Sequence, residues 1–196
     1  MNDYEEHFGL DDSLIIAFAG GPQNRYQWGN VLAKLKLSHV LMRDSSQRYH
    51  HYGVEGIGDQ GAVAAYICSL RSQYSKIVTV GVSSGAYPAL LYGQLAAVDE
   101  VVVISALTGR TRAEWSAEDW PHIVDPANPE VELMPLFVDG PIPKVRAFIS
   151  DGKGTRLDRA MIERIGVTDV TVIPGYAHED LARGMRDVGM FEGLFR

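Results

Sequence analysis

The sequence has little cysteine, no long apolar run and no cluster of positive charge, and each absence narrows what the protein can be. Cys68 is the single cysteine among 196 residues, so an internal disulfide is excluded and a reducing compartment is expected. No apolar run approaches the roughly 20 residues of a membrane-spanning helix, and the opening residues are acidic where a secretory signal would be basic and then apolar. We therefore expect a cytoplasmic protein that does not bind a membrane.

The charged residues argue against nucleic acid as a partner. The 25 Asp and Glu residues outnumber the 18 Lys and Arg residues, which gives a formal net charge of −7. Nucleic-acid binding needs basic residues gathered along one face, and the sequence has no such stripe. The apolar share of 46% is enough for one core without a metal or a disulfide, so we expect a single domain over residues 1–196. No cofactor is expected either.

Short runs rich in β-branched residues alternate with longer stretches of helical period, which predicts βαβ units. The predicted strands are 14–18, 39–42, 77–80, 101–104, 145–149 and 170–173. The predicted helices are 26–36, 61–73, 84–95, 157–165 and 178–187, with a short piece near Phe191. Because the strands are continuous apolar runs, helices should cover both faces of a doubly wound, mostly parallel α/β sheet of six strands.

One connection is far longer than the others. Residues 107–142 carry no convincing strand, and they contain two tryptophans, Trp115 and Trp120, and several prolines. A connection of this length within a compact domain is often functional, so we predict a lid-like insertion that shapes a pocket. The alternative is that the two tryptophans only attach the insertion to the domain.

The most informative segment is G-x-S-x-G at 81–85, which lies between a predicted strand and a predicted helix of small residues. A serine on such a sharp turn has strained backbone angles, and its neighbours two positions away must lack a Cβ. Gly81 and Gly85 meet that need, so Ser83 is the candidate nucleophile. The alternative is a chance pattern in which Ser83 and Ser84 merely cap a helix.

A serine nucleophile needs a base, and the base needs a third group to orient it. His178 follows the last predicted strand, and Asp151 follows the strand before it. The chain order is then Ser, Asp, His, with each residue beyond the carboxyl end of a different strand. Asp158 is an alternative acid if that strand ends later, and it could also cap a helix.

With the elbow 81–85, Asp151, the Gly175-x-x-His178 step and the loop from Ala19 to Pro22, the sequence resembles the α/β-hydrolase superfamily. The resemblance implies an oxyanion hole made by the backbone N–H of Ser84 and one from the loop after the first strand. Pro22 has no N–H, so Gly21 is the first choice and Gly20 the second. Two leading strands that are common in the superfamily have no room here, which gives an expected sheet order of 2-1-3-4-5-6.

The leading hypothesis is a serine hydrolase that cleaves a carboxylic ester or thioester of a small molecule through an acyl-enzyme. The alternatives are an acyltransferase with the same triad and a non-catalytic binding protein on the same fold. Candidate substrate contacts are Arg43, His50, His51, Trp115 and Trp120, and Arg43 could instead form an ion pair with Asp44. A G-x-G-x-x-G match at 56–61 lacks the context of a dinucleotide site, and no metal is expected.

Overall fold

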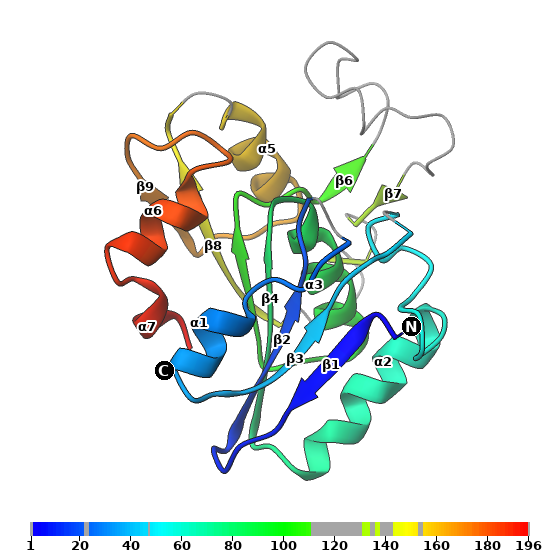
Figure 1. Ribbon diagram of the computed structural model, residues 1–196. Helices are drawn as coiled ribbons and strands as arrows, with labels where there is room; N and C mark the ends of the chain where they lie inside the picture. The colour runs from blue at the N-terminus through cyan, green and yellow to red at the C-terminus, as the bar shows by residue number, and fades with distance from the viewer. Residues whose placement is uncertain are drawn as a thin grey trace.

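The structure, a computed structural model, describes most of the chain (Figure 1). The described residues are 2–21, 24–46, 48–110, 131–133, 136–137, 143–152 and 155–195, without the side chains of 109, 110, 131, 132 and 156. Within these residues no helix is both long enough and apolar enough to cross a bilayer. Most of the predicted insertion, including Trp115 and Trp120, lies outside the described residues.

A seven-stranded sheet with the order β1-β3-β2-β4-β5-β8-β9 forms the middle layer. Its strands are β1 Tyr4–His7, β2 Ser13–Phe18, β3 Ser38–Met42, β4 Lys76–Val82, β5 Glu100–Ile104, β8 Lys144–Ser150 and β9 Val170–Ile173. Six neighbouring strands of this sheet, β3, β2, β4, β5, β8 and β9, are parallel and have the predicted order. The expectation of six strands is corrected by β1, which pairs antiparallel with β3 at the edge of the sheet.

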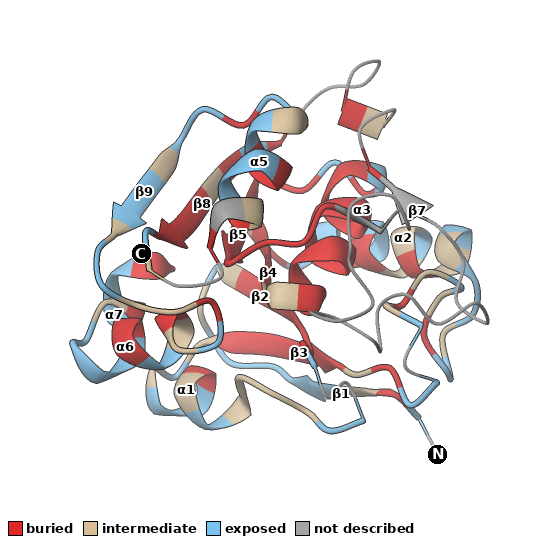
Figure 2. Ribbon diagram, turned by 90° about the horizontal axis from the view of Figure 1, so that it is seen from above, coloured by how far each residue is buried: buried red, intermediate tan, exposed pale blue. Residues whose placement is uncertain are grey.

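Helices cover both faces of this sheet, as Figure 2 shows from above. The helices are α1 Gly29–Lys34, α2 Gln60–Ser69, α3 Ala86–Leu95, α5 Arg156–Arg164, α6 Leu181–Asp187 and α7 Phe191–Leu194. One apolar cluster joins alternate residues of β2 to α2, α3 and α5, and the other joins the remaining residues of β2 to α1, α6 and α7. Burial on both faces explains why the central strands read as unbroken apolar runs.

The described ends of the predicted insertion are attached to the domain. The two-residue strands β6 Gly109–Arg110 and β7 Val131–Glu132 pair antiparallel, which corrects the expectation of no strand in this connection. Leu133 and Phe137 are buried in the same apolar cluster as α3. The insertion therefore begins and ends on the domain that carries the nucleophile elbow.

Candidate active site

Ser83 lies at the turn between β4 and the helical segment that begins with the short 3-10 turn Ser83–Gly85 and continues as α3. Its φ of 52° is in the left-handed region, which is strained for a residue with a side chain. A Cβ on Gly81 would lie 2.0 Å from the carbonyl oxygen of Gly85, and one on Gly85 would lie 2.7 Å from that of Phe18. The two glycines thus let the elbow form against β2, and the predicted turn is confirmed.

Two hydrogen bonds join Ser83 to His178 and His178 to Asp158. The Ser83 Oγ lies 2.8 Å from His178 Nε2, and His178 Nδ1 lies 2.7 Å from Asp158 Oδ1. A carboxylate only accepts, so Nδ1 carries the proton and Nε2 is the acceptor for the Ser83 hydroxyl. This is the tautomer in which His178 can remove the Ser83 proton.

The acid in contact with His178 is therefore Asp158, and the preference for Asp151 was wrong. Asp158 lies in the first turn of α5 on the face that also carries the buried Met161 and Ile162, at the i+3 and i+4 positions. Packing of these side chains against the core points the Asp158 carboxylate inward, where it is 1% exposed. An acid within the apolar face of a helix is a signal in the sequence that could have identified Asp158.

Asp151 has a different contact, because its exposed carboxylate accepts the backbone N–H of Gly175 at 2.8 Å. The neighbouring Ser150 hydroxyl donates to the Ile173 carbonyl and accepts from the N–H of Tyr176. The end of β8 thus holds the loop that leads from β9 to His178. The buried Ser105 hydroxyl adds a bond to the carbonyl of His178 itself, over 3.2 Å.

The residues that carry the predicted oxyanion donors, Gly21 and Ser84, lie close to one another. A Cβ on Gly21 would be 3.7 Å from the Oγ of Ser84, so the loop after β2 passes close to the residue that follows the nucleophile. Gly20 is corrected as a donor, because its N–H donates to the Gln27 side chain at 3.0 Å. The backbone N–H groups of Ser84 and Gly21 remain the candidates.

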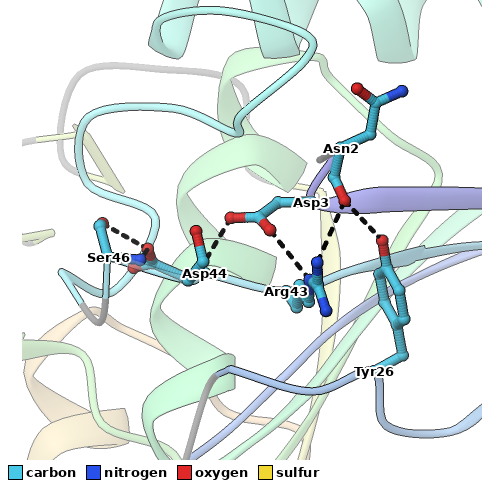
Figure 3. A network of polar contacts seen from close by, with 7 residues as sticks. Asn2, Asp3, Tyr26, Arg43, Asp44 and Ser46 are labelled. Carbon is cyan, nitrogen blue, oxygen red and sulfur yellow. Dashed lines mark hydrogen bonds and ion pairs between the residues drawn. The ribbon is translucent and has the colours of Figure 1, made fainter.

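Arg43 forms a structural ion pair, and its partner is Asp3 in place of the expected Asp44 (Figure 3). The Nε to Oδ1 distance is 2.9 Å, and the guanidinium also lies 4.7 Å from the centre of the Tyr26 ring. Burial raises the pKa of Asp3, but hydrogen bonds from Ser45 and Arg43 outweigh it and leave the pKa below its usual value. Because these contacts occupy the guanidinium, the prediction that Arg43 contacts substrate is not supported.

His50 is also corrected as a substrate contact, because it is 1% exposed. Its ring packs edge-on against the ring of Phe18, with 5.4 Å between the ring centres. Burial lowers the pKa of His50 to about 4, and the carboxylates of Asp44 and Asp3 oppose that shift only in part. His50 is therefore a neutral core residue beneath the loop that leads to Gly20.

His51 is half-buried, and its Nδ1 lies 2.9 Å from the hydroxyl of Tyr87, which is one helical turn beyond Ser83. Its contact with substrate stays a prediction.

Gln27 and Ser105 are residues that the sequence analysis missed. Ser105 bonds to the backbone of a loop 73 positions away, and Gln27 bonds to the backbone of its own connection seven positions earlier. Neither residue stands in a motif.

Known proteins resemble this chain in structure and not in sequence. No protein-family model and no curated protein sequence matches it. Among solved structures, a variant of the capsule O-acetyltransferase of Neisseria meningitidis serogroup A, in complex with CoA, is similar with a TM-score of 0.67 and 12% identity, over 98% of this chain and 91% of that chain. A lipase-esterase related protein from Clostridium acetobutylicum gives 0.62 and 14% over 100% of both chains. The monoacylglycerol lipase of Paleococcus ferrophilus gives 0.57 and 12% over 98% of both.

This chain has the α/β-hydrolase fold. The resemblance inferred from the elbow and the strand order is confirmed at the level of the fold. At such low identities the similarity shows the fold alone, so the activity has to be argued from the site. In this fold the candidate site residues lie beyond the carboxyl ends of β2, β4 and β9, and Asp158 comes from α5.

Proposed function

We propose that the protein is a serine hydrolase that cleaves a carboxylic ester or thioester of a small molecule through an acyl-enzyme. The observation that carries the proposal is the chain of hydrogen bonds from Ser83 through His178 to Asp158, at 2.8 and 2.7 Å. Both His178 and Asp158 are buried, so little water competes for these bonds. A merely structural serine at this turn would not require a buried base and a buried acid behind it.

In the proposed reaction Ser83 Oγ attacks the acyl carbonyl while His178 Nε2 takes the hydroxyl proton. The negative charge that develops on the carbonyl oxygen is stabilised by the backbone N–H groups of Ser84 and Gly21. Asp158 stabilises the imidazolium. Collapse of the tetrahedral intermediate returns the proton to the departing alcohol or thiol and leaves an ester on Ser83, and His178 then activates a water that releases the acid.

Acyl transfer is the second candidate. The similarity in fold to the O-acetyltransferase favours it. The same residues would form the acyl-enzyme, and an alcohol or amine would replace water in the second half. The two differ in the fate of the acyl group. Adding an alcohol acceptor to a turnover assay should raise the yield of transferred ester at the expense of free acid if acyl transfer is the function.

The experiment that tests the proposal is labelling with a fluorophosphonate, which reacts with activated serines. We expect one label per chain on Ser83, located by fragmentation of the peptide that also contains Ser84. Ser83→Ala should abolish the label without changing the circular dichroism spectrum, and Ser75→Ala, at an exposed serine, should label like the original chain. A folded protein that takes no label, or takes it on Ser84, would count against the proposal.

A further inference from the structure

Gln27 makes a two-point contact with a single residue of the oxyanion loop. The N–H of Gly20 donates to Gln27 Oε1 at 3.0 Å, and Gln27 Nε2 donates to the Gly20 carbonyl at 3.2 Å. The side-chain amide thus pairs with the Gly20 backbone as a neighbouring strand would. On its other side Gly20 is pressed against the elbow, since a Cβ there would lie 2.5 Å from the carbonyl oxygen of Val82.

Both neighbours of Gln27 are held by contacts of their own. The Tyr26 hydroxyl donates to the Asn2 carbonyl at 2.9 Å, and its ring lies under Arg43, as Figure 3 shows. Trp28 stacks on Phe191 of α7 with 5.2 Å between ring centres. Gln27 therefore projects from a segment that is fixed on two sides, and its amide can hold a loop in place.

The consequence falls on the peptide that follows Gly20. Since Gln27 occupies the N–H of Gly20, that group is not free for an oxyanion, and the next N–H along the chain belongs to Gly21. The orientation of the Gly21 N–H depends on how the Gly20 peptide is held. An oxyanion donor is effective only if it is already aimed where the charge develops.

We infer that Gln27 is a positioning residue that holds the Gly20 peptide and so aims the N–H of Gly21 at the acyl oxygen. The inference rests on the proposed function. It implies that loss of the Gln27 amide weakens binding of the transition state more than binding of the ester, because the ground-state carbonyl depends less on these donors. The two hydrogen bonds of the Gln27 amide both go to Gly20, so the proton transfer between Ser83 and His178 should be unaffected.

The test compares two substitutions of Gln27 with a matched control. Gln27→Met keeps the length of the side chain and removes both hydrogen bonds. Gln27→Glu keeps an acceptor for the Gly20 N–H and places a charged oxygen against the Gly20 carbonyl. The control is Gln94→Met, because Gln94 also donates its amide to a backbone carbonyl, that of Leu136 at 3.0 Å, and lies near the far end of α3 from the elbow.

For Gln27→Met we expect kcat on an activated aryl ester to fall about 10- to 100-fold with KM changed less than about threefold, somewhat less than the full loss of a donor. The rate of fluorophosphonate labelling and the affinity for a trifluoromethyl ketone that forms a hemiketal with Ser83 should fall by similar factors. The control should keep all three values. The shape of the pH profile of kcat/KM should stay the same for Gln27→Met.

Gln27→Glu adds a signature that a structural role would not give. A protonated Glu can donate as well as accept, so the activity of this variant relative to the original chain should recover as the pH falls toward the pKa of the Glu carboxyl. The corresponding ratio for Gln27→Met should not change with pH. A flat ratio for Gln27→Glu would overturn the inference.

Two further results would overturn the inference while leaving the proposed function intact: labelling of Gln27→Met at the rate of the original chain, or an activity loss that is confined to KM. If Gln27→Met lowers the melting temperature well below that of Gln94→Met, the pH-dependent ratio of Gln27→Glu decides alone. Failure of the original chain to take a label on Ser83 would instead contradict the proposed function.

Discussion

Asp158 stands where an apolar side chain would otherwise face the core, and this position explains both its burial and its single hydrogen bond to His178. In the proposed reaction the Asp158 carboxylate would stabilise the imidazolium that forms when Ser83 attacks. Asp151 instead acts at the surface on the loop that precedes His178. The two acids thus have separate roles, although only seven positions separate them.

We predict that Asp158→Asn lowers kcat/KM on an activated aryl ester by about 10³- to 10⁴-fold, because a neutral amide cannot stabilise the imidazolium and no longer enforces the tautomer. Asp151→Asn should stay within about threefold of the original value, since the asparagine oxygen can still accept the N–H of Gly175. The measurement is steady-state kinetics, with circular dichroism to verify folding. Equal losses for the two variants would show that the Asp158 contact is not the one that matters.

At the scale of elements, the six parallel strands could be predicted because each is an apolar run buried on both faces. The strand β1 could not, because it is mostly exposed and joins the edge of the sheet through backbone hydrogen bonds, which any side chain permits. The two-residue strands β6 and β7 are too short to carry a periodicity.

The candidate site likewise contains residues that the sequence marks and residues that it does not. Ser83 and His178 stand at turns that glycines and strand ends mark in the sequence, and the structure brings their side chains into hydrogen-bond contact. The preference for Asp151 assumed that the acid must follow a strand directly, whereas Asp158 is supplied from within α5. Gln27 could not be found, since no motif marks a side chain that bonds to the backbone seven positions earlier in the same connection.

The opposite edge of the sheet carries a cluster of ion pairs around the buried Glu100, the first residue of β5. Its carboxylate, with a side chain 5% exposed, pairs with Lys76 at 2.8 Å, with Lys144 at 3.4 Å and with Arg146. These residues lie at or near the first residues of β4, β5 and β8, so the cluster joins three neighbouring strands at their amino ends. Ser83 follows the carboxyl end of β4, at the other edge.

We predict that Glu100→Gln lowers the free energy of unfolding by about 1–2 kcal/mol, because the carboxylate is buried but its three cations are partly exposed and screened by water. The kcat/KM of the folded variant should not change. Chemical denaturation and ester hydrolysis measure the two quantities. Glu163→Gln is the matched control, because its pair with Arg159 is exposed and should contribute less than about 0.5 kcal/mol.

The pH dependence of this effect has a defined sign. Burial raises the pKa of Glu100, but Lys76 and Arg146 outweigh burial and leave the pKa below 4.5. The carboxylate therefore stabilises the fold above pH 4.5, and this contribution is lost as the pH falls through the lower, folded-state pKa. Glu100→Gln should make stability less dependent on pH in that acid range, and an unchanged acid slope would contradict the assignment.

At the scale of the whole molecule, charge is unevenly distributed. Residues 107–140 contain seven acids, Glu114, Glu118, Asp119, Asp125, Glu130, Glu132 and Asp139, against the two bases Arg110 and Arg112, for a balance of −5 within a total of −7. The described ends of this segment adjoin the site, since the N–H of Leu107 donates to the Ser83 carbonyl at 3.4 Å. Negative charge near a pocket mouth lowers the local concentration of anions.

We predict that anionic esters are poorer substrates than neutral or cationic esters of matched shape. The difference should appear in kcat/KM at low ionic strength and shrink as added salt screens the charge. A matched series measured at two salt concentrations gives the result. Equal values at low salt, or a preference for the anion, would refute the prediction. Arg43 could not explain a preference for the anion, because its guanidinium is already paired with Asp3.

The place of Asp158 on α5 also bears on how the length of this chain can vary. Met161 and Ile162 fix the rotation of α5 against the core, so the direction of the carboxylate is set within the helix. Residues added or removed between Gly152 and α5 would change the connection and leave that direction intact. One residue inserted between Asp158 and Met161 would turn the carboxylate by about 100° around the helix axis, away from His178. Homologues and engineered variants should therefore differ in length ahead of α5 far more readily than within its first two turns.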